Sequence, residues 1–255
     1  MEDWRQNVYF VLVEPVEPGN IGASARAIKN MGFRNLCLVN PSREMSEEGR
    51  WFARNAHDVL DSAEVFDSVE EALSDKAVVV GTTRRKGKRR GVIFPADKGS
   101  ERVRDLAAKN RVAVLFGREA RGLYNEEVED CGFMITIPSS ELQPSLNLSQ
   151  AVLIIAYELS KCWQAMARGR VVPKKRYDNS VLMDDLRAQE EIRPLYDKIA
   201  GVLELLDYVH RGDRDLMKKI LTNIKHFIGR AGLTEWELNM LQGLCHQIEK
   251  RVPKR

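Results

Sequence analysis

The stretch that decides the fold reads Val112-Ala113-Val114-Leu115-Phe116-Gly117-Arg118-Glu119, five apolar residues followed at once by glycine and two charged residues. A run this short and this uniformly apolar predicts a strand that protein covers on both faces. Similar runs occur at residues 8–13, 36–39, 77–80 and 133–137, and segments with helical patterns lie between them. Strands that alternate with helices are typical of βαβ units, so we expect an α/β domain with a mostly parallel sheet.

Helical patterns fill the spaces between strands and the C-terminal third. Residues 21–31 predict a helix that Asn20 can cap and Gly32 can end. Residues 148–167 predict a long, largely buried helix, and three more helices are expected at 181–207, 214–229 and 234–251. Proline and charge interrupt the pattern near residue 173. We therefore predict a domain over residues 1–168, a basic linker over 169–180 and a helical region over 181–255.

Composition limits the class of protein. Of the 255 residues, 44% are hydrophobic and 30% are charged, which is the balance of a soluble globular protein. No stretch approaches the length of a membrane span, and the first residues lack the features of a signal peptide. We therefore expect a cytoplasmic protein with no membrane contact. The four cysteines and four histidines show no metal-ligand spacing, so we expect no metal.

The basic residues are clustered, although the net charge of +3 is too small to identify a nucleic-acid-binding protein. Residues 84–90 read RRKGKRR, with six basic residues in seven. A second cluster contains Arg168, Arg170, Lys174, Lys175 and Arg176. A charge run is usually a solvated surface. Two dense clusters in one chain nevertheless favour a polyanionic partner.

Several common catalytic motifs are missing at the strand ends, where an open α/β sheet binds its ligands. No GxGxxG follows the first strand. Residues 81–88 resemble a P-loop, but the glycine spacing is wrong and Arg89 stands where a serine or threonine is needed. There is no GxSxG, and no histidine lies in these loops. We therefore do not expect dinucleotide chemistry, P-loop chemistry or hydrolysis driven by histidine.

Three polar segments at the strand ends remain. They are PGNIGASAR at residues 18–26, LFGREARGL at 115–123, and residues 137–149, which begin Ile137-Pro138 and end Ser145-Leu146-Asn147-Leu148-Ser149. In order and spacing they resemble motifs 1, 2 and 3 of the SpoU branch of the SPOUT methyltransferases, over roughly residues 7–165. Within that branch, GTTRR at residues 81–85 and the helical C-terminal extension are most similar to TrmJ-type tRNA (cytidine/uridine-2′-O)-methyltransferases.

The resemblance implies a fold and an activity. The fold is a parallel sheet with a deep C-terminal trefoil knot, an exception to the rule that chains avoid knots. The resemblance also implies a homodimer formed through the knotted domain, with S-adenosylmethionine bound in each knot. The implied activity is 2′-O-methylation of tRNA, by analogy at the cytidine or uridine of anticodon-loop position 32. Two alternatives stay open: a non-catalytic RNA-binding or assembly protein with the same fold, and a 2′-O-methyltransferase that acts on rRNA.

The resemblance further assigns roles to individual residues. The implied cofactor contacts, made largely by backbone groups, are Thr82, Thr83, Leu115, Gly117, Ile137, Pro144, Ser145 and Leu146. The implied catalytic residues are Arg26, Asn20, Glu119, Ser145 and Asn147. An arginine cation is hardly ever deprotonated in proteins, so we expect Arg26 to grip a phosphate and polarise the 2′-oxygen rather than act as a general base. The proton acceptor stays open, as does the protomer that supplies Arg26.

Simpler interpretations exist for several of these residues. Asn20 can be a plain helix cap, and Glu119 can be a surface carboxylate paired with Arg118 or Arg121. For the basic run, we expect contacts with the tRNA backbone from Arg84, Arg85, Lys86, Lys88, Arg89 and Arg90. The C-terminal helices can hold a second part of the tRNA or extend the dimer interface, and the sequence does not decide between these roles.

Overall fold

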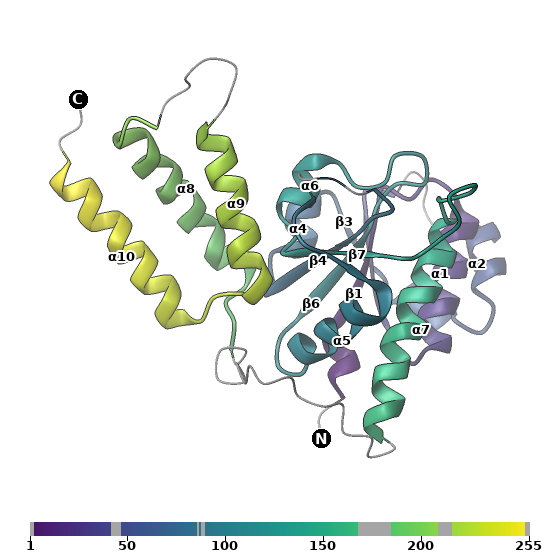
Figure 1. Ribbon diagram of the computed structural model, residues 1–255. Coiled ribbons are helices and arrows are strands. Elements are labelled where there is room, and N and C mark those ends of the chain that lie inside the picture. Colours follow the sequence, from purple (N-terminus) through teal and green to yellow (C-terminus); the bar gives the residue numbers. More distant parts are fainter. Residues whose placement is uncertain are drawn as a thin grey trace.

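A parallel sheet forms the centre of the molecule. The computed structural model describes residues 3–41, 47–85, 87, 90–167, 185–208 and 216–252. Within these residues, seven strands pair in the order β3-β2-β1-β6-β4-β7-β5, and every pairing is parallel (Figure 1). The strands are β1 (Val8–Val13), β2 (Asn35–Val39), β3 (Glu64–Phe66), β4 (Val78–Thr82), β5 (Ile93–Pro95), β6 (Val112–Phe116) and β7 (Phe133–Thr136). The predicted α/β class and the five predicted strands are confirmed, whereas the two edge strands β3 and β5 were not predicted.

Helices cover both faces of the sheet, because neighbouring residues of each strand point to opposite sides. In the sheet domain they are η1 (Trp4–Asn7), α1 (Pro18–Asn30), α2 (Glu47–Ala53), α3 (His57–Asp61), α4 (Val69–Leu73), α5 (Ala96–Ala107), α6 (Asn125–Glu129) and α7 (Leu148–Ala167). Phe10 and Leu12 of β1 join a core with α1, α5 and α7. Val11 and Val13 of the same strand join a second core with α4 and α6. The central strands are therefore buried on both faces, as their sequences predict.

The helix α1 begins earlier than its hydrophobic pattern predicted. Pro18 lies in its first turn, where the missing N–H of proline costs no helical hydrogen bond, and Glu17 is the N-cap residue. Asn20 therefore lies inside the helix, and the prediction that it caps the helix is wrong. Gly32, with φ of +82°, follows the end of α1 as predicted. The early start fixes the direction of the Asn20 side chain.

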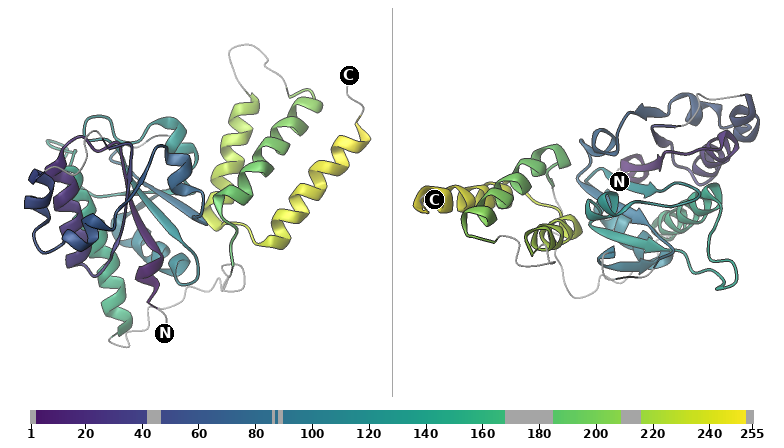
Figure 2. Two further views of the ribbon diagram at one scale, coloured as in Figure 1. Left: turned by 180° about the vertical axis from the view of Figure 1, so that it is seen from behind. Right: turned by 90° about the horizontal axis from the view of Figure 1, so that it is seen from above.

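A second group of helices, α8 (Gln189–Leu205), α9 (Leu216–Ala231) and α10 (Glu235–Arg251), lies beside the sheet domain (Figure 2). These helices share their own apolar core, which includes Ile192, Ile228 and Leu238. The α9 backbone approaches the sheet domain so closely that a Cβ atom on Gly132 would lie 1.8 Å from the carbonyl oxygen of Gly229. The predicted helical C-terminal region is confirmed. The predicted linker over 169–180, with the second basic cluster, lies outside the described residues.

The strand order places one strand between two strands that follow each other in the sequence. Because β4 lies between β6 and β7, the chain passes across β4 on its way from β6 to β7. It then continues into α7, which packs against α1 and α5. The trefoil knot itself stays a prediction from the resemblance. In the part of the chain that the structure describes, no helix is long and apolar enough to cross a membrane.

Candidate active site

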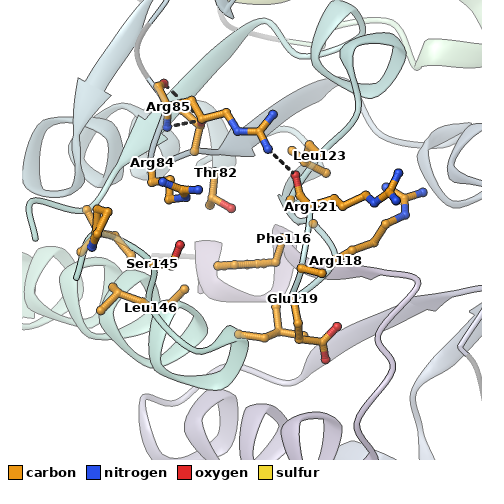
Figure 3. Close-up of a pocket in the computed structure, with 18 of the residues that line it drawn as sticks. Thr82, Arg84, Arg85, Phe116, Arg118, Glu119, Arg121, Leu123, Ser145 and Leu146 are labelled. Atoms are coloured by element: carbon orange, nitrogen blue, oxygen red, sulfur yellow. Dashed lines mark hydrogen bonds between the residues drawn. The ribbon is translucent and has the colours of Figure 1, made fainter. Parts of the chain in front are cut away.

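A pocket opens at the carboxyl ends of β4, β6 and β7, the edge where the sequence places a ligand site (Figure 3). Loops that follow these three strands line it, together with the start of α7. Ser145 and Leu146 lie on one side of the pocket and the loop with Arg118, Glu119 and Arg121 on the other. Of the predicted cofactor contacts, the pocket lining includes Thr82, Thr83, Gly117, Ile137, Pro144, Ser145 and Leu146.

Leu115 is the one predicted cofactor contact that does not line the pocket. Its side chain is fully buried in the core formed with α4 and α6 and does not line the pocket. Its carbonyl oxygen accepts a hydrogen bond from the hydroxyl of Thr82 at 2.9 Å. The next residue, Phe116, lines the pocket instead, because adjacent strand residues point to opposite faces. Because the predicted contacts are made largely by backbone groups, the contact of Leu115 with the cofactor stays a prediction, and the side chain of Phe116 adds an apolar wall to the pocket.

Two glycines allow the loop after β6 to fold back on itself. A Cβ atom added at Gly117 would lie 2.1 Å from the carbonyl carbon of Gly122. Gly122 has φ of +67°, a left-handed conformation that glycine adopts without strain, and its N–H donates to the carbonyl oxygen of Arg118 at 2.7 Å. The turn places backbone groups against the pocket. Apolar walls from Phe116, Ile137 and Leu146 stand beside these groups.

Residues of all three motifs meet in one chain of hydrogen bonds at the rim of the pocket. The side-chain amide of Asn147 donates to Asn20 Oδ1 at 2.9 Å, and the amide of Asn20 donates to Glu119 Oε1 at 3.0 Å. Asn147 Oδ1 accepts from the N–H and the hydroxyl of Ser149, at 2.9 and 2.7 Å. Both asparagine amides are thus fixed in one orientation. We call this chain from Glu119 through Asn20 to Asn147 the amide relay.

The carboxylate of Glu119 anchors the amide relay. Besides Asn20, it accepts hydrogen bonds from the backbone N–H groups of Val16 and Glu17, at 3.3 and 3.4 Å. Arg118 pairs with two other carboxylates, and no hydrogen bond or ion pair in the described residues joins Glu119 to Arg118 or Arg121. Of the simpler interpretations, neither the helix cap at Asn20 nor the arginine pair at Glu119 is found in the structure.

Arg26 and Ser145 stand apart from the amide relay. Arg26 lies on the exposed side of α1, and its guanidinium makes no hydrogen bond or ion pair within the described residues. It does not line the pocket of its own chain. The hydroxyl of Ser145 faces the pocket and likewise has no hydrogen-bond partner among the described side chains. Both groups are therefore available to a bound ligand.

The basic run is only partly displayed at the pocket. Arg84 and Arg85 are exposed and line it, and Arg85 Nη2 donates to the carbonyl oxygen of Arg121 at 3.2 Å (Figure 3). Arg90 is only 8% exposed, and burial together with the nearby charge of Arg85 lowers its pKa. Arg90 also lines the pocket, although most of its side chain is buried, and its contact with the RNA backbone stays a prediction. Lys86, Lys88 and Arg89 lie outside the described residues.

The comparisons with known proteins agree with this geometry. Residues 7–157 match the SpoU rRNA methylase family. The chain is 34% identical to the tRNA (cytidine/uridine/adenosine-2′-O-)-methyltransferase TrmJ of Pseudomonas aeruginosa, with 95% of this chain and 94% of the relative covered. It is 33% identical to the tRNA (cytidine/uridine-2′-O-)-methyltransferase TrmJ of Escherichia coli, with 96% of each covered. The crystal structure of TrmJ from Z. mobilis superposes with a TM-score of 0.75 at 28% identity and covers 94% of this chain and 98% of that one.

The chain therefore belongs to the SpoU methylase family, and it is a methyltransferase. Enzymes of this family use S-adenosylmethionine as the methyl donor. The pocket fits that molecule, because apolar walls from Phe116, Ile137 and Leu146 suit an adenine ring and polar groups such as the hydroxyls of Thr83 and Ser145 line the same pocket. Within the described residues, no cluster of three or more histidine, cysteine or acidic side chains could hold a metal ion.

Proposed function

We propose that this chain transfers the methyl group of S-adenosylmethionine to the ribose 2′-hydroxyl of a tRNA nucleotide. The observation that carries the proposal is the amide relay, which joins the three motifs beside a pocket of the right chemistry. The names of the two similar TrmJ enzymes support tRNA as the substrate. The two names differ in whether adenosine is included among the methylated nucleotides. We place the reaction at a cytidine or uridine of anticodon-loop position 32, in the cytoplasm.

Each residue near the pocket has a part that follows from its position. The cofactor supplies a methyl group already activated for transfer, so the protein must mainly place the 2′-oxygen in line with it. The fixed amides of Asn20 and Asn147 can orient the ribose, since Glu119 holds the amide of Asn20 and Asn20 holds that of Asn147. The free hydroxyl of Ser145 can contact either the cofactor or the ribose. Preorganised donors of this kind stabilise the charge that develops as the hydroxyl loses its proton.

Arg26 is the implied catalytic residue that belongs to neither the pocket nor the amide relay, and we infer that it serves the pocket of a second copy of this chain. It is exposed, has no partner in the described residues and does not line its own pocket. Leu153 and Tyr157, one turn apart on α7, are 40% and 51% exposed. Apolar side chains in this arrangement suit a helix that packs against another chain, which supports a homodimer formed through the sheet domain.

Mixing two inactive variants tests whether Arg26 acts across a dimer. Arg26→Ala should abolish transfer while leaving cofactor affinity within a few-fold. Arg26→Ala mixed with a variant that has lost cofactor binding should recover activity, because one pocket in each mixed dimer is intact. Light scattering should give the mass of a dimer. A monomer, or no recovery in an exchanged mixture, would contradict the assignment of Arg26 to the partner.

The substrate is tested by transfer of labelled methyl groups to tRNA transcripts. We expect label in a tRNA with cytidine or uridine at position 32, and none when that nucleotide carries 2′-deoxyribose. Label that persists in the deoxy transcript would move the target to another nucleotide. Label in rRNA alone would favour the rRNA methyltransferase alternative. Tight RNA binding without label in tRNA or rRNA pools would favour the non-catalytic alternative.

A further inference from the structure

Arg118 lies at the centre of a cluster of charges next to the amide relay. Its Nε and Nη2 donate to the two carboxylate oxygens of Glu14, at 2.7 and 2.6 Å. Its Nη1 and Nη2 also reach the two oxygens of Glu127, at 3.1 and 2.9 Å. The guanidinium lies 3.8 Å from the centre of the Tyr124 ring. One side chain therefore joins the end of β1 to the loop after β6 and to the start of α6.

These contacts leave Arg118 unsuited to bind RNA, although it lines the pocket. An arginine has five N–H donors, and two carboxylates occupy most of those of Arg118. The side chains of Arg118 and Glu127 are each only 10% exposed. The two carboxylates raise the pKa of Arg118, and the arginine in turn lowers the pKa of Glu14. The charge of Arg118 is thus used within the protein and is not available to a phosphate.

Glu14 holds an unusual backbone conformation at the other end of this contact. Its φ is +46°, in the left-handed region that non-glycine residues rarely adopt. Its N–H donates to the carbonyl oxygen of Val39 at 2.8 Å. Such a conformation persists when the surrounding contacts hold it, and it often occurs at functional sites. Here it turns the chain out of β1 and into the loop that leads to Asn20.

Consecutive residues of the loop after β6 hold this same segment at two points. Arg118 binds the side chain of Glu14, and Glu119 binds the backbone N–H groups of Val16 and Glu17. The segment 14–17 is thereby tied to a loop that also shapes the cofactor pocket through Gly117 and Gly122. A displacement of one loop must therefore move the other.

We propose that Arg118 is a positioning residue that locks the cofactor loop, residues 117–122, to the loop that carries Asn20. The inference rests on the proposed function, because it assigns the cofactor to the pocket beside this loop. This lock keeps the methyl donor and the amide relay in a fixed position relative to each other. Arg118 touches neither reacting group and acts through Glu14 and Glu127.

Variants on both sides of the lock test the proposal, with S-adenosylhomocysteine as the probe. Arg118→Gln should weaken binding of the probe by about 10-fold in calorimetry and lower kcat further, because a displacement of about 1 Å suffices for a large loss. Glu14→Gln should do the same, although Glu14 does not line the pocket. The double variant should be no worse than either single one. Arg118→Lys should recover only part of the loss, because an ammonium cannot pair with both carboxylates in the planar geometry of arginine.

Arg50→Gln is the matched control, because Arg50 forms an exposed ion pair with Asp61 on α2 and α3 rather than at the pocket. It should bind the probe as the unchanged protein does. If Arg118→Gln binds the probe with the affinity of the unchanged protein, the lock is overturned. It is also overturned if the double variant loses affinity by the sum of the losses, in free energy, of Arg118→Gln and Glu14→Gln. If the unchanged protein binds no probe, the proposed function fails, and hydrogen exchange still decides the lock. Joint loss of protection at 14–20 and 117–124 in Arg118→Gln would support it, and unchanged exchange would overturn it.

Discussion

Replacing Gly117 with alanine should open the cofactor pocket by a displacement that the structure allows us to calculate. The added Cβ would lie 2.1 Å from the carbonyl carbon of Gly122 and 2.2 Å from the N of Leu123. Cβ atoms essentially never approach other heavy atoms within 3.0 Å, so the backbone at residue 117 and the backbone at Gly122 must move apart by about 0.9 Å. Both contacted atoms belong to the backbone, so no side-chain rotation can relieve the clash.

A shift of this size in the pocket wall should affect binding and catalysis more than folding. Misplacement by about 1 Å can reduce an enzymatic rate by about 100-fold, and we expect a loss of that order in methyl transfer. The affinity for S-adenosylhomocysteine should fall by about 10-fold or more, because the apolar walls of the pocket move apart. Overpacking costs about 1–3 kcal/mol of stability, so the variant should still fold.

Calorimetry with S-adenosylhomocysteine and thermal unfolding measure the two effects separately. Gly243→Ala is the control, because a Cβ at Gly243 in α10 meets nothing within 4 Å and alanine favours a helix over glycine by about 1 kcal/mol. It should bind the ligand normally and unfold at an equal or higher temperature. Binding by Gly117→Ala within two-fold of the unchanged protein would refute the claim that the contact between Gly117 and Gly122 shapes the site.

Three further predictions concern the amide relay, the basic run and the lock. Asn147→Ala should lower kcat by about 10- to 100-fold in methyl-transfer assays, because it frees Asn20, while probe affinity measured by calorimetry stays within a few-fold. An equal loss of affinity would place Asn147 in the cofactor site. Replacing Arg84 and Arg85 with glutamine should weaken tRNA binding and reduce its salt dependence, with a change of about 0.9 in the slope for each lost phosphate contact in filter binding across salt concentrations. An unchanged slope would exclude both residues from the RNA contact. Because Arg118 lowers the pKa of Glu14 below 4.5, its value without these contacts, the ion pair stabilises the fold above that pH and loses its effect as pH falls through the lower pKa. The free energy of unfolding should therefore fall less with decreasing pH in Arg118→Gln than in the unchanged protein. An equal pH dependence in the two proteins would contradict this contribution of the ion pair.

The strands that sequence predicts well are those whose burial is complete. The runs at β1 and β6 are apolar throughout because helices cover them on both faces. The strands β3 and β5 have three residues each and contain no fully buried side chain, so no apolar run marks them. Edge strands of this kind form because a neighbouring strand offers hydrogen bonds, which is information that the local sequence does not carry.

The candidate site was predictable at the level of loops and less so at the level of side chains. Motif order placed Asn20, Glu119 and Asn147 in one site, and they do lie together. The orientation of Leu115 and Phe116 depends on which face of the sheet borders the pocket, which the continuous apolar run leaves open.

The ion pairs of Arg118 could not be predicted from the sequence either. Its neighbour Glu119 is adjacent in sequence, but its partner Glu14 is 104 residues away and was not predicted. Only the pairing of β1 with β6 brings these two residues together. Phe116 could have been found from the strand pattern once the pocket face was known, whereas Glu14 and Glu127 carry no signal in the motif.

Mass spectrometry of nucleosides from tRNA treated with the protein and S-adenosylmethionine tests the central claim most directly. The account predicts one new methyl group that stays with the ribose when the glycosidic bond is broken, and its loss when Asn147 is replaced by alanine. Methyl groups on a base, or tRNA nucleosides of unchanged mass, would contradict the conclusion that this pocket serves methylation of a ribose hydroxyl.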